Sequence, residues 1–170
     1  MPARRRGLAG ERIATRRYRV SIRVGDPVPT VSVEAYVRDE ADPVSIDIGR
    51  PGGSWTVLFF YPRDFTFVCP TELRGFAEME ADFALEDAAV VAASTDSWHV
   101  HRAWLETSPG LTGIRYPVVA DPAQELTRLY GVLDHEDGSA LRATFIIDPK
   151  GIVRHASITD ASVGRNRYMR

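Results

Sequence analysis

Cysteine is almost missing from this chain: among 170 residues there is one, Cys69. A single thiol cannot form a disulfide within the chain, which excludes the disulfide-stabilised class of small secreted proteins and favours a reducing compartment, most simply the cytoplasm. The sequence also has no apolar run near the roughly 18 residues that a membrane helix needs. We therefore expect neither a disulfide scaffold nor a membrane protein.

Neither positive nor negative charge is in large excess: the chain has 21 Lys and Arg residues and 23 Asp and Glu residues, for a net charge of −2. This balance gives no global reason to expect nucleic acid as a partner. The exception is residues 1–20, which are rich in arginine and hold one acid, Glu11. We interpret them as a basic, disordered tail; a targeting presequence and an arm that binds an anionic surface are the alternatives. Residues 21–170 are enough for one domain with its own core.

The apolar pattern alternates between strand and helix periods. The run at 55–62, β-branched and aromatic, fits a central strand buried on both faces. Helical spacing follows at 70–85, where Pro70 suits the first turn and Thr71 is the expected N-cap. Further strands are expected within 24–37, 40–55, 87–95 and 114–121, helices at 97–108 and 121–132, and a hairpin at 141–158 around the turn 148–151.

The resulting order, β-β-α-β-α-β-α-β-β, indicates an α/β fold with a central mixed sheet flanked by helices. A strand–helix–strand start followed by a closing hairpin is typical of the thioredoxin-like arrangement. In the helix at 121–132, Asp121 is the expected N-cap, with Pro122 in the first turn and Gly131 at the end.

Cys69 falls between the expected central strand and the helix that follows it. A lone cysteine is commonly a small buried hydrophobe. At a helix N-terminus, however, open backbone N–H groups stabilise an anion, and the thiolate is the reactive form of cysteine. Position alone leaves both interpretations open.

Two neighbours in the loop before Cys69 bear on this choice. Thr66 lies three residues earlier, so its hydroxyl can approach the sulfur if the loop curls into the first turn. Pro62 ends the strand and can shield the sulfur from water. The alternative is that Thr66 only caps the helix and Pro62 only stops the strand.

The stretch PRDFTFVCPTE, residues 62–72, resembles the active-site signature of the peroxiredoxins, P-x-x-x-T/S-x-x-C, in the form typical of the alkyl hydroperoxide reductase C and thiol-specific antioxidant group. The similarity continues through STDSWHVHRAW, YPVVADP and LRATFIIDPKGIVRH, and covers roughly residues 21–166. It implies a thioredoxin fold and a thiol-dependent peroxidase that reduces hydrogen peroxide and alkyl hydroperoxides through a cysteine sulfenic acid, in antioxidant defence and redox homeostasis. It implies no metal, haem or flavin cofactor.

The resemblance also implies roles for individual residues. Cys69 matches the peroxidatic nucleophile, Thr66 the residue that hydrogen-bonds sulfur and peroxide, and Pro62 the shield. Arg142 matches the arginine that stabilises the thiolate and the charge developing on the leaving oxygen. A guanidinium is a permanent cation, and stabilising charge that grows in the transition state is usually the largest catalytic effect.

Supporting roles follow from the same resemblance. Glu72 and Arg128 are expected to orient the arginine, and Phe67 and Trp104 to pack around the cysteine loop. Two other candidates, His99 and His101, are spaced i, i+2 and do not share a helix face. No cluster of Cys, His and carboxylates accompanies these histidines in the sequence, and no phosphate-binding glycine motif is present, so we expect no metal or nucleotide site.

The sequence departs from the typical 2-Cys branch of the family in having no second cysteine to act as the resolving thiol. A shortened 2-Cys enzyme and a 1-Cys mechanism, in which an external thiol reduces the sulfenic acid, both remain open. The implied partners are a peroxide, an external thiol reductant of the thioredoxin-like or reductase-partner kind, and a second copy of the chain in a homodimer or a decamer. A non-enzymatic alternative is a holdase or redox sensor in which Cys69 reports peroxide to a partner.

Overall fold

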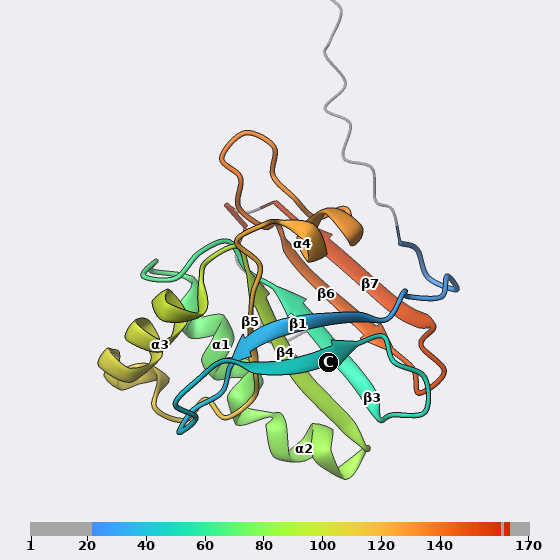
Figure 1. Ribbon diagram of the computed structural model, residues 1–170, viewed down its shortest axis with the longest axis horizontal. Helices are drawn as coiled ribbons and strands as arrows, with labels where there is room; N and C mark the ends of the chain where they lie inside the picture. The colour runs from blue at the N-terminus through green and yellow to red at the C-terminus, as the bar shows by residue number, and fades with distance from the viewer. Residues whose placement is uncertain (1–21, 161, 164–170) are drawn as a thin grey trace, which may run out of the picture.

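The computed structural model describes residues 22–160, 162 and 163. The basic tail expected at 1–20 lies outside the described residues. Those that are described form one seven-stranded sheet with the order β2-β1-β5-β4-β3-β6-β7, with helices on both of its faces (Figure 1).

The strands and helices follow the sequence in an alternating order. The strands are β1 (Val31–Tyr36), β2 (Val44–Ile48), β3 (Trp55–Phe60), β4 (Ala88–Ser94), β5 (Val118–Ala120), β6 (Arg142–Ile147) and β7 (Val153–Thr159). The helices are α1 (Cys69–Glu78), α2 (Glu80–Leu85), α3 (Trp98–Thr107) and α4 (Glu125–Leu129), with a 3₁₀ turn at Pro109–Leu111.

Strand pairing makes the sheet mixed, as predicted. β3, β4 and β5 run parallel at its centre, while β6 and β7 extend it antiparallel on one side and β1 and β2 on the other. The hairpin of β6 and β7 closes through the predicted turn, where Gly151 donates to the carbonyl of Asp148 at 2.8 Å. Gly151 has φ +77°, a conformation that glycine adopts without a steric penalty.

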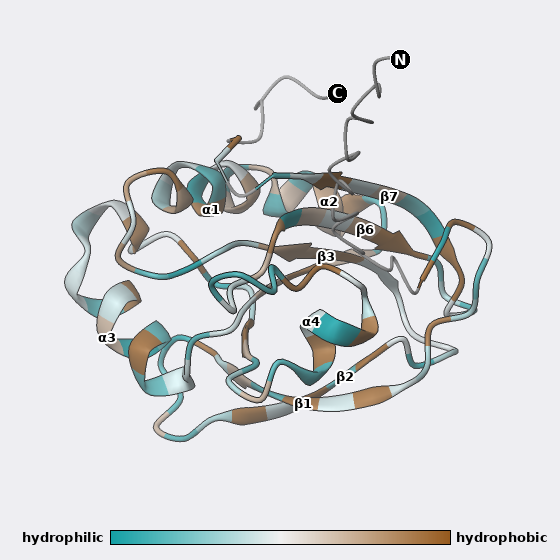
Figure 2. Ribbon diagram, turned by 90° about the horizontal axis from the view of Figure 1, so that it is seen from above, coloured by the Kyte–Doolittle hydropathy of each residue, from teal (hydrophilic) through white to brown (hydrophobic). Residues whose placement is uncertain are grey.

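The central strand β3 divides the core in two. Its side chains alternate, so Leu58 and Phe60 enter the cluster that α4 covers through Leu126. Val57 and Phe59 enter the other cluster, which holds Cys69 and Leu73 of α1 and Trp104 and Leu105 of α3. Figure 2 shows β3 and β6 as largely hydrophobic strands between these layers. The predicted strand buried on both faces is confirmed.

The helix expected at 70–85 is two helices. Met79 takes φ −97°, ψ −1° and its N–H bonds the carbonyl of Phe76 at 3.2 Å, so α1 closes in a tight turn before α2 begins. The predicted cap is also wrong: α1 begins at Cys69 with Val68 as the flanking residue, and the Thr71 hydroxyl donates to the Val68 carbonyl at 2.8 Å.

The helix expected from Asp121 begins later, at Glu125. Gln124, in the left-handed region with φ +60°, is the flanking residue, because 121–124 form a turn first. Asp121 still serves the helix across that turn, since its carboxylate accepts from the backbone N–H of Leu126 at 3.2 Å and of Thr127 at 2.7 Å. The prediction that Asp121 caps this helix is confirmed, but the predicted start of the helix is too early.

Candidate active site

Cys69 is the first residue of α1 and follows the loop that leaves the end of β3. Its side chain is completely buried, in the same core cluster as Leu73 and Trp104. The start of α1 carries the positive end of the helix dipole, which favours an anion there. The prediction that Cys69 stands at a helix N-terminus is confirmed.

A buried arginine lies beside this cysteine. Arg142 is the first residue of β6, and because Phe60 pairs with Ala143, it stands next to the end of β3. Its Nη1 donates to Sγ of Cys69 at 3.6 Å. The geometry puts a permanent cation in contact with the sulfur.

Glu72 completes this arrangement from the first turn of α1. The same Nη1 of Arg142 donates to its Oε2 at 2.5 Å, and the side chains of Arg142 and Glu72 are only 6% and 3% exposed. Burial removes both charges from water, so the pair depends on close, charge-assisted hydrogen bonding. Glu72 therefore contacts Arg142, the residue that the family resemblance expects it to orient.

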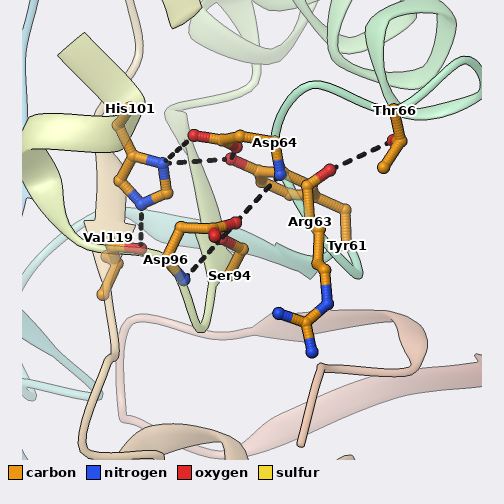
Figure 3. Close-up of polar contacts among 8 residues, drawn as sticks. All are labelled: Tyr61, Arg63, Asp64, Thr66, Ser94, Asp96, His101 and Val119. Carbon is orange, nitrogen blue, oxygen red and sulfur yellow. Dashed lines mark hydrogen bonds and ion pairs between the residues drawn. The ribbon is translucent and has the colours of Figure 1, made fainter. Parts of the chain in front are cut away.

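Thr66 and Pro62 lie in the loop between β3 and α1, and both are half-buried. The Thr66 hydroxyl donates to the backbone carbonyl of Arg63 at 3.1 Å (Figure 3). Its single proton is therefore directed to Arg63, which leaves its oxygen able to accept a hydrogen bond.

The two residues expected to pack around the cysteine loop, Trp104 and Phe67, differ in burial. Trp104 is buried and its ring lies 6.1 Å, centre to centre, from those of Tyr61 and Phe65, so it packs against the loop. Phe67 is fully exposed, and the prediction that it packs around the loop is wrong, because the chain at this point has left the sheet and no core element covers it.

Arg128 is placed on the other side of the molecule from Cys69. It lies on α4, which covers the opposite face of the sheet. Its side chain donates to the carbonyl of Ala123 at 2.8 Å and to Oε1 of Gln124 at 2.6 Å. The expectation that Arg128 orients Arg142 is wrong, because the sheet separates the two residues.

Sequence reasoning missed a buried polar network under the loop (Figure 3). Its side chains come from the ends of β3 and β4, from the loop and from α3, and it ends on a carbonyl of β5: Tyr61, Asp64, Ser94, Asp96, His101 and Val119. The sequence suggests His101 only as a candidate metal ligand. Its spacing of three residues from Trp98 and from Trp104 was the available signal, because it predicts a buried histidine, and a buried histidine needs hydrogen-bond partners.

Both ring nitrogens of His101 have protein partners, Asp64 and the carbonyl of Val119, and neither is left to bind a metal. Among residues 22–160, 162 and 163, no group of three or more His, Cys, Asp or Glu side chains is arranged to hold a metal ion. Within the same residues, no helix has the length and apolar character that crossing a bilayer requires.

A buried thiol at the start of a helix, after a central strand of a mixed sheet and in contact with a buried arginine, defines a thioredoxin-fold thiol enzyme. The AhpC/TSA family model matches residues 24–156. The chain is 42% identical to peroxiredoxin tpx1 of Schizosaccharomyces pombe over 150 residues, which cover 86% of this chain and 77% of that protein. It is 42% identical to a thioredoxin peroxidase of Echinococcus granulosus over 146 residues, covering 84% and 75%.

The crystal structure of Enterococcus faecalis AhpC matches with a TM-score of 0.80 and 37% identity, over 85% of each chain. The chain therefore belongs to the AhpC/TSA family of peroxiredoxins, which confirms the resemblance predicted from residues 62–72. Its activity is thiol-dependent peroxide reduction.

Proposed function

We propose that Cys69 is the nucleophile of this peroxidase. The contact between Arg142 Nη1 and Cys69 Sγ, 3.6 Å, is the observation that carries the assignment. The thiolate attacks one peroxide oxygen, the O–O bond breaks, and Cys69 becomes a sulfenic acid. The other oxygen leaves with the bonding electron pair and takes up a proton, giving water from hydrogen peroxide or an alcohol from an alkyl hydroperoxide.

Three further residues act on the peroxide in this proposal. Arg142 stabilises the thiolate and the negative charge that grows on the leaving oxygen. Thr66, whose own proton is given to Arg63, accepts a hydrogen bond from the peroxide O–H and so orients it. Pro62, half-buried at the end of β3, limits the access of water to the sulfur.

An external thiol is the proposed reductant, because the given sequence has no second cysteine. A thiolate of a thioredoxin-like or reductase partner attacks the sulfenic sulfur and hydroxide leaves as water, forming a mixed disulfide. A second external thiol then releases Cys69 and leaves the reductant as its disulfide. This cycle works in a reducing cytoplasm, where we place the protein in antioxidant defence.

Peroxide consumption with dithiothreitol or thioredoxin as reductant, for the wild type and Cys69→Ser, tests this proposal. Steady turnover by the wild type that disappears in Cys69→Ser is expected. The lone thiol also favours a second candidate, a redox sensor, for which fast oxidation of Cys69 without repeated turnover would be the result.

We propose that a second copy of the chain covers the exposed apolar part of the Cys69 loop. Phe67 is fully exposed there, and Phe65 and Val68 are 62% and 42% exposed, beside a buried site. A homodimer, or a decamer built from it, would bury these side chains. Light scattering should show a smaller assembly for Phe67→Glu than for Leu85→Glu, a matched change at an exposed leucine on α2; equal masses would reject this interface.

A further inference from the structure

Asp64 anchors the loop that carries Thr66. It lies two residues after Pro62 and two before Thr66, with a side chain 1% exposed. Its Oδ2 lies 2.7 Å from Nδ1 of His101, and its Oδ1 accepts from the Tyr61 hydroxyl at 2.6 Å. Side chains from α3 and from the residue after β3 therefore meet at one loop carboxylate (Figure 3).

The backbone of Asp64 is held as well. Its N–H donates to Oδ2 of Asp96 at 2.9 Å, and that same oxygen accepts from Ser94 Oγ at 2.9 Å. Asp96 follows β4, so the loop is attached to the neighbouring strand through its main chain and to α3 through its side chain.

The residue between Asp64 and Thr66 shows why such anchoring is needed. Phe65 has φ +55°, in the left-handed region that aromatic residues avoid. Its side chain is 62% exposed, so burial of Phe65 does little to hold this backbone. The hydrogen bonds of Asp64 on one side and of Thr66 to Arg63 on the other hold it instead.

His101 is held at both ring nitrogens. Its Nε2 lies 3.1 Å from the carbonyl oxygen of Val119 on β5, and its Nδ1 lies 2.7 Å from Oδ2 of Asp64. Because the ring is fixed from β5, its contact with Asp64 fixes the loop carboxylate in turn.

We propose that His101 and Asp64 are positioning residues for the peroxide step: their hydrogen bond holds residues 62–68 in the conformation that presents Thr66 and Pro62 to Cys69. The inference rests on the proposed role of Cys69. Neither residue touches the sulfur in this arrangement; both act through the loop. Loss of either side chain breaks this hydrogen bond and removes the attachment of the loop to α3.

Two other titratable groups face the pair, Tyr61 from the end of β3 and Asp96 from the end of β4. Burial and the nearby Asp64 charge raise the pKa of Tyr61 well above its ordinary value, so its hydroxyl stays protonated and donates to Asp64. Asp96 is engaged by the Ser94 hydroxyl and by the backbone of Asp64 itself.

The test measures the rate constant of Cys69 oxidation by hydrogen peroxide in a single turnover near neutral pH. Asp64→Ala should react at least about tenfold more slowly near neutral pH. Asp64→Asn keeps both bonds, because its amide N–H can donate to Nδ1 and its oxygen can accept from Tyr61. Its rate should therefore recover to within about threefold of the wild type.

His99→Asn, on the exposed side of the same helix, is the matched control and should keep the wild-type rate. A folded Asp64→Ala with the wild-type rate, or a folded Asp64→Asn as slow as Asp64→Ala, would overturn the inference. If Asp64→Ala does not fold, Asp64→Asn decides: a rate within about threefold of the wild type supports the inference, and a rate at least about tenfold lower overturns it. Cys69→Ser tests the proposed nucleophile separately. Retained peroxide consumption in this variant would refute Cys69 as the nucleophile, but it would not refute the role of the His101–Asp64 pair.

Discussion

Arg142 and Cys69 are 73 residues apart in the sequence, yet Nη1 of Arg142 donates to Sγ of Cys69 at 3.6 Å. The antiparallel pairing of β3 with β6 makes this contact, because it sets the first residue of β6 beside the point where β3 ends and the loop to α1 begins. The same nitrogen is held by Glu72. A fixed cation thus reaches the sulfur without having to reorganise during the reaction.

Removing this cation should slow the peroxide step. For Arg142→Ala we expect a rate constant of Cys69 oxidation at least about tenfold lower, equivalent to roughly 1.4 kcal/mol of lost transition-state stabilisation. Rapid-mixing measurements in a single turnover give this constant directly. Arg115→Ala, at an arginine 61% exposed, is the control and should match the wild type.

Arg142→Ala also breaks a buried ion pair, which typically costs about 3–5 kcal/mol of stability when one partner is removed. The double variant Arg142→Ala/Glu72→Gln removes both charges and should unfold at higher denaturant concentration than Arg142→Ala. Its peroxide rate should stay as low as that of the single variant. Recovery of the rate together with the stability would mean that Arg142 acts only through folding.

Glu72→Gln by itself tests orientation. The glutamine can still accept from Arg142 but carries no charge, so the guanidinium should be held less firmly beside the sulfur. We expect the peroxide step to slow by about three- to tenfold, less than in Arg142→Ala. A rate equal to that of the wild type would show that Arg142 needs no carboxylate to hold its position.

Thr66 offers a test of hydrogen-bond direction. Thr66→Ser keeps an oxygen that can donate to Arg63 and accept from the peroxide, whereas Thr66→Val removes it at nearly constant volume. We expect at least about tenfold slower oxidation of Cys69 in Thr66→Val and little change in Thr66→Ser. Equal rates in the two variants would leave the Thr66 hydroxyl without a role in the peroxide step.

Asp148 gives a prediction on stability. Its carboxylate accepts from the backbone N–H of Ile152 at 2.9 Å and from Nε of Arg154 at 2.7 Å, and these bonds hold the pKa of Asp148 below its ordinary value. A lowered folded-state pKa stabilises the protein above the unfolded-state value of about 3.9. That contribution is lost as the pH falls through the lower folded-state value.

Thermal melting of Asp148→Ala should therefore show a lower midpoint than the wild type at neutral pH, and the difference should shrink as the pH falls below about 4. Asp42→Ala, at an exposed aspartate in the turn before β2, is the control. A difference between Asp148→Ala and the wild type that stays constant down to pH 3 would contradict this account of the hairpin.

Elements with strong local signals could be predicted from the sequence. The run at 55–62 is apolar at every position of β3 that the sheet buries, and the 148–151 turn has the residues that a hairpin requires. The division of 70–85 into α1 and α2 was missed because the apolar spacing continues across Met79, and the break lies in its backbone angles. The start of α4 was missed because Asp121 can cap from a position before an intervening turn.

The residues of the site also fall into those that a local motif predicts and those that depend on contacts distant in the sequence. A motif in one short stretch identified Cys69, Thr66 and Pro62, and its resemblance to a family added Arg142. The sequence does not show which face of the sheet a residue occupies, so the expectation for Arg128 was wrong. It also does not show which loop side chains other elements cover, so Phe67 was expected to be covered. The His101–Asp64 contact joins α3 to a loop 37 residues earlier, and no local pattern reports such a pairing.

The account rests on Cys69 as the atom that accepts peroxide oxygen. The most direct measurement is to treat the reduced protein with one equivalent of hydrogen peroxide in the presence of a sulfenic-acid trap and to locate the adduct by mass spectrometry. We predict an adduct on Cys69 in the wild type and none in Cys69→Ser, which should also lose peroxide consumption. Consumption that continues in Cys69→Ser, or a wild type that consumes peroxide with no oxidation at Cys69, would contradict the account.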